Sequence, residues 1–196
     1  MRQFLLILVL TLFDPVAVPA QDTDYVNVII ADLDRDKRDD TFRICPQNSG
    51  ICLAYRLSSM DFSEMKSGTL ESLGESSALK IRDGVVSLTN LFMRGSNVFK
   101  FRYDSKTGDF LVIGYDNTQM GNAAGDGSGS SSYNLLTGVY KAQWYYWDEE
   151  RRKLEPRPAI SEKLEITPYK LQDFGESLIE EFYQLDFRLY ETMLLR

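Results

Sequence analysis

The sequence predicts a mainly β protein: a single-domain antiparallel β-sheet or sandwich with one C-terminal amphipathic helix. Three observations lead to this prediction. Short runs rich in β-branched and aromatic residues recur along most of the chain. Turn residues separate these runs, among them the pair Asp83-Gly84, which is a strong hairpin signal. Apolar residues recur at helical spacing only in the C-terminal part of the chain.

The chain begins with an apolar stretch that predicts a signal peptide, residues 1–20. Arg2 precedes the apolar run 4–13, and Val18-Pro19-Ala20 offers small or modest side chains to signal peptidase. The run is too short to span a membrane, because a spanning helix needs about 20 apolar residues. We therefore expect a periplasmic or secreted protein with no membrane span after removal of the signal.

Beyond the signal, we expect a β domain over 21–153 and a linker and helix over 154–196 that pack on it. The predicted strands are 26–31, 41–45, 51–57, 79–82, 85–92, 97–103, 109–115, 132–137, 139–147 and 162–166. In 97–103, aromatic residues alternate with Val98, Lys100 and Arg102, so one face is aromatic and the other is mixed or charged, which indicates a sheet with one buried face. Residues 58–78 are polar, and we interpret them as a long connection with at most one helical turn.

The C-terminal helix is predicted to begin at Thr167-Pro168, with threonine as N-cap and proline in the first turn. One apolar stripe comprises Leu171, Phe174, Leu178, Phe182, Leu185, Leu189 and Met193, and a second comprises Ile179, Tyr183, Phe187, Tyr190 and Leu194. One stripe is enough to dock a helix on a sheet. The second stripe leaves two alternatives: internal packing, or a surface for a second copy or another protein.

Cys45 and Cys52 are the two cysteines of the chain. Turn residues lie between them and strand-like residues flank them, so we expect a disulfide near the tip of a hairpin. The alternatives are a redox pair or half of a zinc site. The spacing differs from C-x-x-C, and the chain has no histidine to complete a zinc site.

A ladder of aspartates follows the first predicted strand and is the strongest candidate site. Hard cations such as Ca²⁺ take six to eight oxygen ligands, and alternate residues of a tight loop converge on one point. The candidate ligands are Asp32, Asp34, Asp36, Arg38 through its carbonyl group, and Asp40. Lys37 occupies the position where such loops carry glycine. We expect a structural Ca²⁺; the alternative is a charged turn neutralised by its own basic residues.

The segment from Ile30 through Asp36 to Asp40-Thr41 resembles the calcium loops of FG-GAP and VCBS-type repeats, the blade motif of integrin α-like propellers. The motif occurs once, so a propeller of several blades is not expected. Downstream, 99–103, 110–116 and 131–138 are similar to a family of uncharacterised exported proteins of Gram-negative bacteria, in which a single VCBS-like Asp loop precedes these strands. The resemblance covers about residues 26–140. It implies a β fold and export, and it implies no activity.

The run Trp144-Tyr145-Tyr146-Trp147 places one tryptophan and one tyrosine on each face of a strand. Such aromatic residues either pack under the helix or form a surface for protein or sugar. The candidate binding surface combines this strand with the second stripe of the helix. Its residues are Trp144, Tyr146, Tyr183, Phe187 and Tyr190.

The composition argues against two classes of function, nucleic-acid binding and catalysis. The net charge is −7, which argues against nucleic acid as a partner. The chain has no histidine, so the commonest general base is missing and an enzyme is not expected. We predict a non-enzymatic exported protein-binding module, specifically a periplasmic immunity or inhibitor protein that binds a toxin, or a protein that self-associates through its C-terminal helix. The alternatives are a carbohydrate-binding module that uses the aromatic surface and a hydrolase that uses carboxylates alone.

Overall fold

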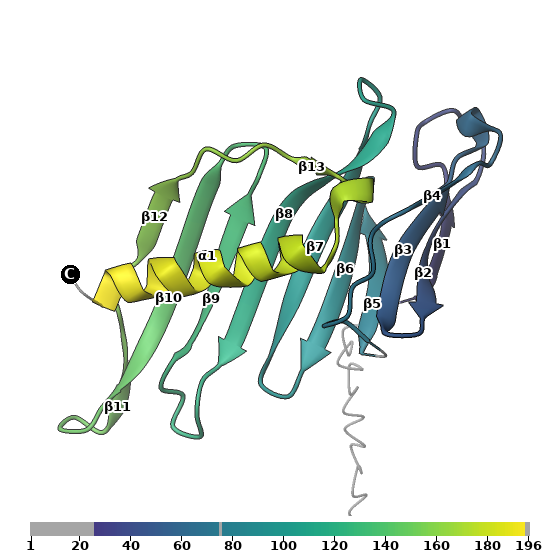
Figure 1. Cartoon of the computed structure of the whole chain (residues 1–196). Helices are drawn as coiled ribbons and strands as arrows, with labels where there is room; N and C mark the ends of the chain where they lie inside the picture. The colour runs from purple at the N-terminus through teal and green to yellow at the C-terminus, as the bar shows by residue number, and fades with distance from the viewer. Residues whose placement is uncertain (1–25, 75, 195–196) are drawn as a thin grey trace, which may run out of the picture.

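A computed structural model describes residues 26–74 and 76–194, so the predicted signal peptide, residues 1–20, lies outside the described residues. The described chain is mainly β. It forms two antiparallel sheets, of four and nine strands, and a single α-helix, α1 (Glu176–Leu194), near the C-terminus (Figure 1). The predicted fold class is confirmed. No helix among the described residues has the length and apolar character needed to cross a membrane.

The smaller sheet has the strand order β1-β2-β3-β4. Its strands are β1 (Val28–Ala31), β2 (Asp40–Gln47), β3 (Gly50–Arg56) and β4 (Glu64–Lys66). The prediction that 58–78 is only a connection is wrong at β4, although a short 3₁₀ helix, η1 (Ser58–Met60), supplies the expected helical turn. Local propensity does not favour a strand of Glu, Met and Lys. Pairing with β3 holds it in place, with Met65 opposite Tyr55.

The larger sheet runs in the order β11-β10-β9-β8-β7-β6-β5, with β12 paired to β10 and β13 paired to β8. The bounds are β5 (Ser77–Arg82), β6 (Val85–Phe92), β7 (Gly95–Asp104), β8 (Asp109–Met120), β9 (Ser128–Asn134), β10 (Val139–Asp148), β11 (Lys153–Pro156), β12 (Ile160–Lys163) and β13 (Tyr169–Lys170). Strands β12 and β13 lie in the segment 154–196, so this segment adds strands to the sheet as well as the helix.

The alternation predicted for 97–103 is present in β7. Phe99 and Phe101 are buried on one face, whereas Lys100 and Arg102 lie on the other. Lys100 forms an ion pair with Asp116 of the neighbouring β8 on this outer face. The larger sheet therefore has one apolar face covered by protein and one polar face toward solvent.

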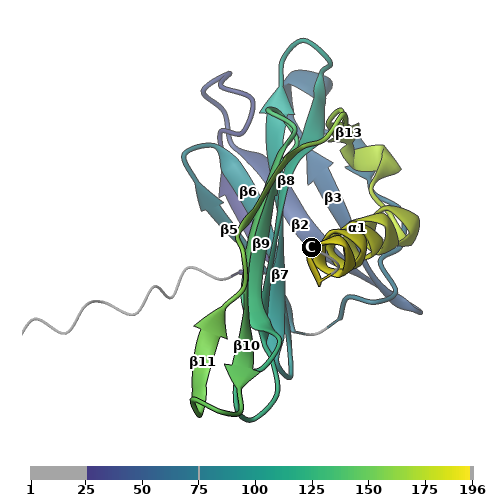
Figure 2. The same cartoon turned by 90° about the vertical axis from the view of Figure 1, so that its left-hand side faces the viewer.

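Helix α1 covers the apolar face of the larger sheet. It crosses over β7 to β10 on one side of the sheet (Figures 1 and 2). Phe182 stacks on Tyr115 with ring centroids 5.0 Å apart, and it also contacts Phe99 and Tyr133 through their rings. The second apolar stripe changes along the helix: Ile179 is buried, whereas Phe187 is 55% exposed.

The predicted helix start at Thr167-Pro168 is wrong, because α1 begins at Glu176. In β13, Tyr169 lies opposite Val112, and a short 3₁₀ helix, η2 (Leu171–Asp173), follows. Pairing with β8 supplies backbone hydrogen bonds that a helix would otherwise provide, and it outweighs the local N-cap signal.

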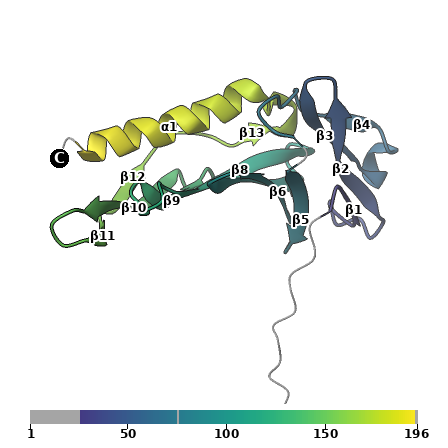
Figure 3. The same ribbon diagram turned by 90° about the horizontal axis from the view of Figure 1, so that it is seen from below.

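The smaller sheet stands at one end of the larger sheet, beside β5 (Figure 3). Aromatic side chains join the two sheets. Phe42 of β2 lies 5.1 Å from Phe110 and 6.0 Å from Phe101, measured between ring centroids. Tyr55 of β3 lies 5.0 Å from the Phe110 ring and donates a hydrogen bond to the buried Asp109. The two sheets and the helix thus share one continuous apolar core.

Candidate functional site

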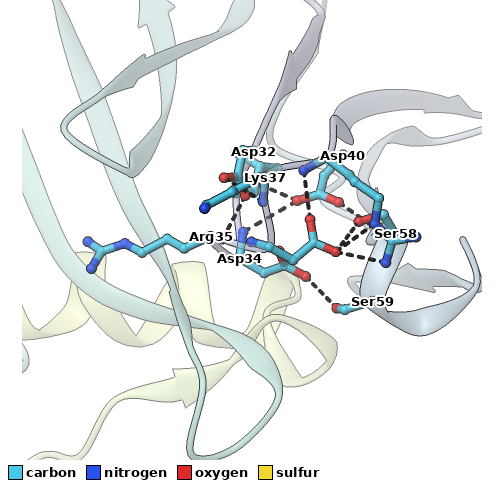
Figure 4. A network of polar contacts seen from close by, with 10 residues as sticks. Asp32, Asp34, Arg35, Lys37, Asp40, Ser58 and Ser59 are labelled. Atoms are coloured by element: carbon cyan, nitrogen blue, oxygen red, sulfur yellow. Dashed lines mark hydrogen bonds and ion pairs between the residues drawn. The ribbon is translucent and has the colours of Figure 1, made fainter.

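The Asp loop, residues 32–40, connects β1 to β2. Asp32, Asp34 and Asp40 each offer a carboxylate oxygen, and these oxygens all lie within 4.8 Å of one another (Figure 4). Oxygen donors at this separation are of the kind that a hard cation takes. The structure thus brings together three of the five predicted ligand residues.

Backbone conformation explains how the loop turns so sharply. Arg35 and Lys37 both have a φ of 71°, in the left-handed region that glycine adopts most freely. Lys37 therefore takes the conformation that its place in the ladder requires. Asp32 stabilises it: one carboxylate oxygen accepts a 2.7 Å hydrogen bond from the Arg35 amide, and the other accepts a 3.0 Å bond from the Lys37 amide.

Asp40 differs from the other aspartates of the loop in that its side chain is fully buried. Its Oδ2 accepts hydrogen bonds from the backbone amides of Leu33 and Asp34, at 2.8 and 3.3 Å. Its Oδ1 accepts a 2.7 Å bond from the amide of Ser58. This carboxylate ties the two ends of the loop together and ties both to η1.

The remaining predicted ligands, Asp36 and Arg38, form an ion pair with each other. The Arg38 guanidinium donates to Asp36 Oδ2 at 2.9 Å, and the Ser58 hydroxyl donates to the same oxygen at 2.6 Å. The hydrogen bond from Ser58, followed by those from Arg38, lowers the pKa of Asp36. Ser59 donates in turn to Asp34. Sequence reasoning missed both serines, because nothing local shows that η1 lies against the loop (Figure 4).

Cys45 and Cys52 form a disulfide between opposite positions of β2 and β3, with Cα atoms 5.0 Å apart. The predicted pairing is confirmed. A disulfide is typical of proteins that leave the reducing cytosol, so it is consistent with export.

Four of the five residues of the predicted aromatic surface line a pocket between α1 and the larger sheet. This helix–sheet pocket has a volume of about 390 Å³ and is lined by Asn117, Gln119, Gly127, Trp144, Tyr183, Asp186, Phe187 and Tyr190. Trp144 is only 5% exposed and contacts the Tyr190 ring edge-on at 5.5 Å. Its indole N–H is buried without a hydrogen-bond partner among the described residues. Trp144 is therefore a wall of the pocket and not an outward platform.

Tyr146, the remaining residue of the predicted surface, does not line this pocket. The guanidinium carbon of Arg157 lies 4.9 Å from the centre of its ring. This cation–π contact covers a face that a sugar would need for stacking. The structure thus separates Tyr146 from the four other aromatic residues.

Asp186 is a site residue that sequence reasoning missed. It is 7% exposed, and its Oδ1 accepts 2.7 Å hydrogen bonds from the hydroxyl groups of Tyr140 and Ser131. Its Oδ2 accepts a 2.8 Å bond from the side-chain amide of Asn117. Burial raises the pKa of Asp186 above its usual range. The available signal was its position four residues after Phe182, on the apolar side of the helix.

A second exposed feature lies at one end of the larger sheet. The side chains that form it are Leu91, Phe92, Met93 and Met120, exposed by 58%, 37%, 96% and 61%. We call this group the β6–β7 tip, because the first three residues end β6 and begin its turn into β7. The sequence alone did not point to this group, since apolar residues at a strand end are equally typical of a buried core.

Comparisons with protein-family models, curated proteins and solved structures gave no match to this chain. Its resemblance to exported proteins with a single VCBS-like Asp loop therefore stays a prediction.

Proposed function

We propose that this chain is an exported, non-enzymatic protein-binding module whose Asp loop holds a structural Ca²⁺. The observation that carries the proposal is the β6–β7 tip. Several large apolar side chains exposed at one end of a sheet are costly for an isolated protein and are typical of protein–protein interfaces. Met93 alone leaves 96% of its surface exposed. The partner we propose is another exported protein, a toxin that the module inhibits.

The structure around the tip supports a role in binding, because the tip is held in shape. The Arg94 guanidinium donates hydrogen bonds to the carbonyl oxygens of Gly121 and Asn122, the latter at 2.6 Å. The Met120 amide donates to the Arg94 carbonyl at 2.8 Å. These bonds join the turn after β6 to the end of β8. A surface that is ordered before binding loses less conformational entropy when a partner docks.

The Ca²⁺ part of the proposal rests on the group formed by Asp32, Asp34 and Asp40. Carboxylates at this distance repel each other, and a bound cation removes that repulsion. The proposed role is structural, because the loop connects β1 to β2 and contacts η1 through Ser58 and Ser59. A location outside the cytosol agrees with both the disulfide and a weak calcium site, since extracellular modules bind Ca²⁺ at about 0.1–1 mM.

Site-specific photo-crosslinking tests the tip directly. A crosslinking amino acid at position 93 is expected to form a defined adduct with another exported protein in periplasm. The same amino acid at position 136 is the matched control, because Leu136 is also an exposed apolar residue but lies in the turn between β9 and β10. Met93→Asp should abolish co-purification of the captured protein, whereas Leu136→Asp should retain it.

Three outcomes would count against the proposal. Equal adducts at both positions would show non-specific contact. An adduct with twice the mass of the chain would show self-association in place of a separate partner. Absence of any adduct at position 93 in periplasm would exclude the tip as a binding surface.

A further inference from the structure

The helix–sheet pocket contains a buried carboxyl group, that of Asp186, which lacks a cationic partner among the described residues. Tyr140, Ser131 and Asn117 donate hydrogen bonds to Asp186, and all three are neutral donors. None of the ion pairs found among the described residues includes Asp186. A buried carboxylate is costly unless an opposite charge compensates it. The pocket therefore favours a ligand that brings a positive charge.

The walls of the pocket suit the same kind of ligand. Four aromatic side chains line it: Trp144 from β10, and Tyr183, Phe187 and Tyr190 from α1. Aromatic rings attract cations through their negative faces, and the attraction is strongest where water is excluded. The volume of about 390 Å³ lies within the range of small-molecule sites, about 300–1,000 Å³.

We propose that the helix–sheet pocket binds a small organic cation, a primary or quaternary ammonium compound, with its charge between Asp186 and the aromatic walls. None of the four residues of the β6–β7 tip lines this pocket, so this proposal is tested independently of the proposed protein partner.

The polar floor of the pocket favours an ammonium over a sugar. Asn117 already donates to Asp186 and accepts a 3.1 Å hydrogen bond from Gln119. The Tyr183 hydroxyl already accepts a 2.7 Å bond from Asn97. Sugar hydroxyls need several free donors and acceptors, whereas a quaternary ammonium has no N–H group and needs only a carboxylate and aromatic surface. The floor supplies the Asp186 carboxyl group, which a bound cation would hold in its ionised form, and has few hydrogen-bonding groups left over.

Calorimetric titration of the full chain tests this proposal with defined probes. Choline and butylamine are expected to bind. Neohexyl alcohol, the uncharged carbon analogue of choline, should bind about tenfold more weakly or not at all, because it lacks the charge that aromatic rings and Asp186 attract. Methyl glucoside is the probe for the sugar alternative.

Variants then locate the binding site. Phe187→Ala should weaken choline binding by about tenfold, since it removes one aromatic wall. Phe62→Ala is the matched control, because Phe62 is 52% exposed, close to the 55% of Phe187, and does not line the pocket. Asp186→Asn should reduce the preference for choline over neohexyl alcohol, because only the aromatic rings then attract the charge, with circular dichroism confirming that this variant is folded.

The proposal is overturned if neither amine binds, if neohexyl alcohol binds as tightly as choline, or if methyl glucoside binds in their place. Equal choline affinity in Phe187→Ala and the native chain would place the binding elsewhere and would also overturn it. Because Phe187 is largely exposed, its variant gives a decisive result even if Asp186→Asn fails to fold.

Discussion

The backbone amide of Ser58 donates a 2.7 Å hydrogen bond to Oδ1 of Asp40, and this bond joins the Asp loop to η1. The other oxygen of the same carboxylate holds the amides of Leu33 and Asp34. The last aspartate of the ladder thus organises the loop through backbone hydrogen bonds, in addition to offering an oxygen to a cation. A loop shaped by its own hydrogen bonds has less conformational entropy to lose when an ion binds.

Replacing Asp40 should destabilise the fold strongly. Asp40→Ala leaves three backbone amides without their acceptor, and a buried unsatisfied group costs about 1–3 kcal/mol. We expect the free energy of unfolding to fall by more than about 2 kcal/mol in urea denaturation. Asp39→Ala is the control, because Asp39 is exposed. Similar losses in the two variants would show that Asp40 has no special structural role.

Calcium should stabilise the chain through the Asp loop. Addition of about 0.1–1 mM Ca²⁺, the range in which extracellular modules bind, should raise the melting temperature relative to a sample in chelator. The double variant Asp32→Asn, Asp34→Asn should lose this increase, whereas Asp39→Asn should keep it. A melting temperature that does not respond to Ca²⁺ in the native chain would identify the loop as a hydrogen-bonded turn only.

Glu64 should make stability depend on pH in the acid range. Hydrogen bonds from Arg43, followed by Lys66, hold the pKa of Glu64 at about 2, below its ordinary value of 4.5. A carboxyl whose pKa is lower in the folded state stabilises the fold above its unfolded pKa and loses this effect as the pH falls through its folded pKa. The melting temperature of Glu64→Gln should therefore lie below that of the native chain above pH 4.5, and the difference should vanish near pH 2.

The control for this measurement is Glu71→Gln, which changes an exposed glutamate. A constant difference between Glu64→Gln and the native chain from neutral pH to pH 2 would show that the charge of Glu64 does not contribute.

Two phenylalanines of α1 should respond differently to truncation. Phe182 is 2% exposed and contacts Tyr115, Phe99 and Tyr133, so Phe182→Ala should cost about 3–5 kcal/mol of unfolding free energy. Phe187 is 55% exposed, so Phe187→Ala should cost about 0.5 kcal/mol or less. Denaturant titration of both variants measures the difference. Equal costs would contradict the packing of α1 on the larger sheet.

Strand positions were largely predictable because a half-buried sheet imposes alternation on the chain itself. In β7, Phe99 and Phe101 alternate with Lys100 and Arg102, and this alternation shows the buried face without any knowledge of the neighbouring strands. The pairing of Cys45 with Cys52 was predictable for a similar reason, since a short turn separates two strand-like runs. Strand β4 and the start of α1 were not predictable, because they depend on pairing with another strand, of Met65 with Tyr55 and of Tyr169 with Val112, and not on the local sequence.

Local sequence patterns were sufficient to predict the β class, the disulfide, the position of the Asp ladder and the aromatic content of the C-terminal helix. These features follow from local periodicity and spacing, which lie within one element or one turn. The three-dimensional fold was needed to show that Ser58 and Ser59 bind the ladder, that Asp186 is buried at a pocket lined by four aromatic residues, and that Met93 is exposed to solvent. The physical reason is that burial and charge compensation depend on contacts between distant segments, and one sequence does not encode those contacts in any local pattern.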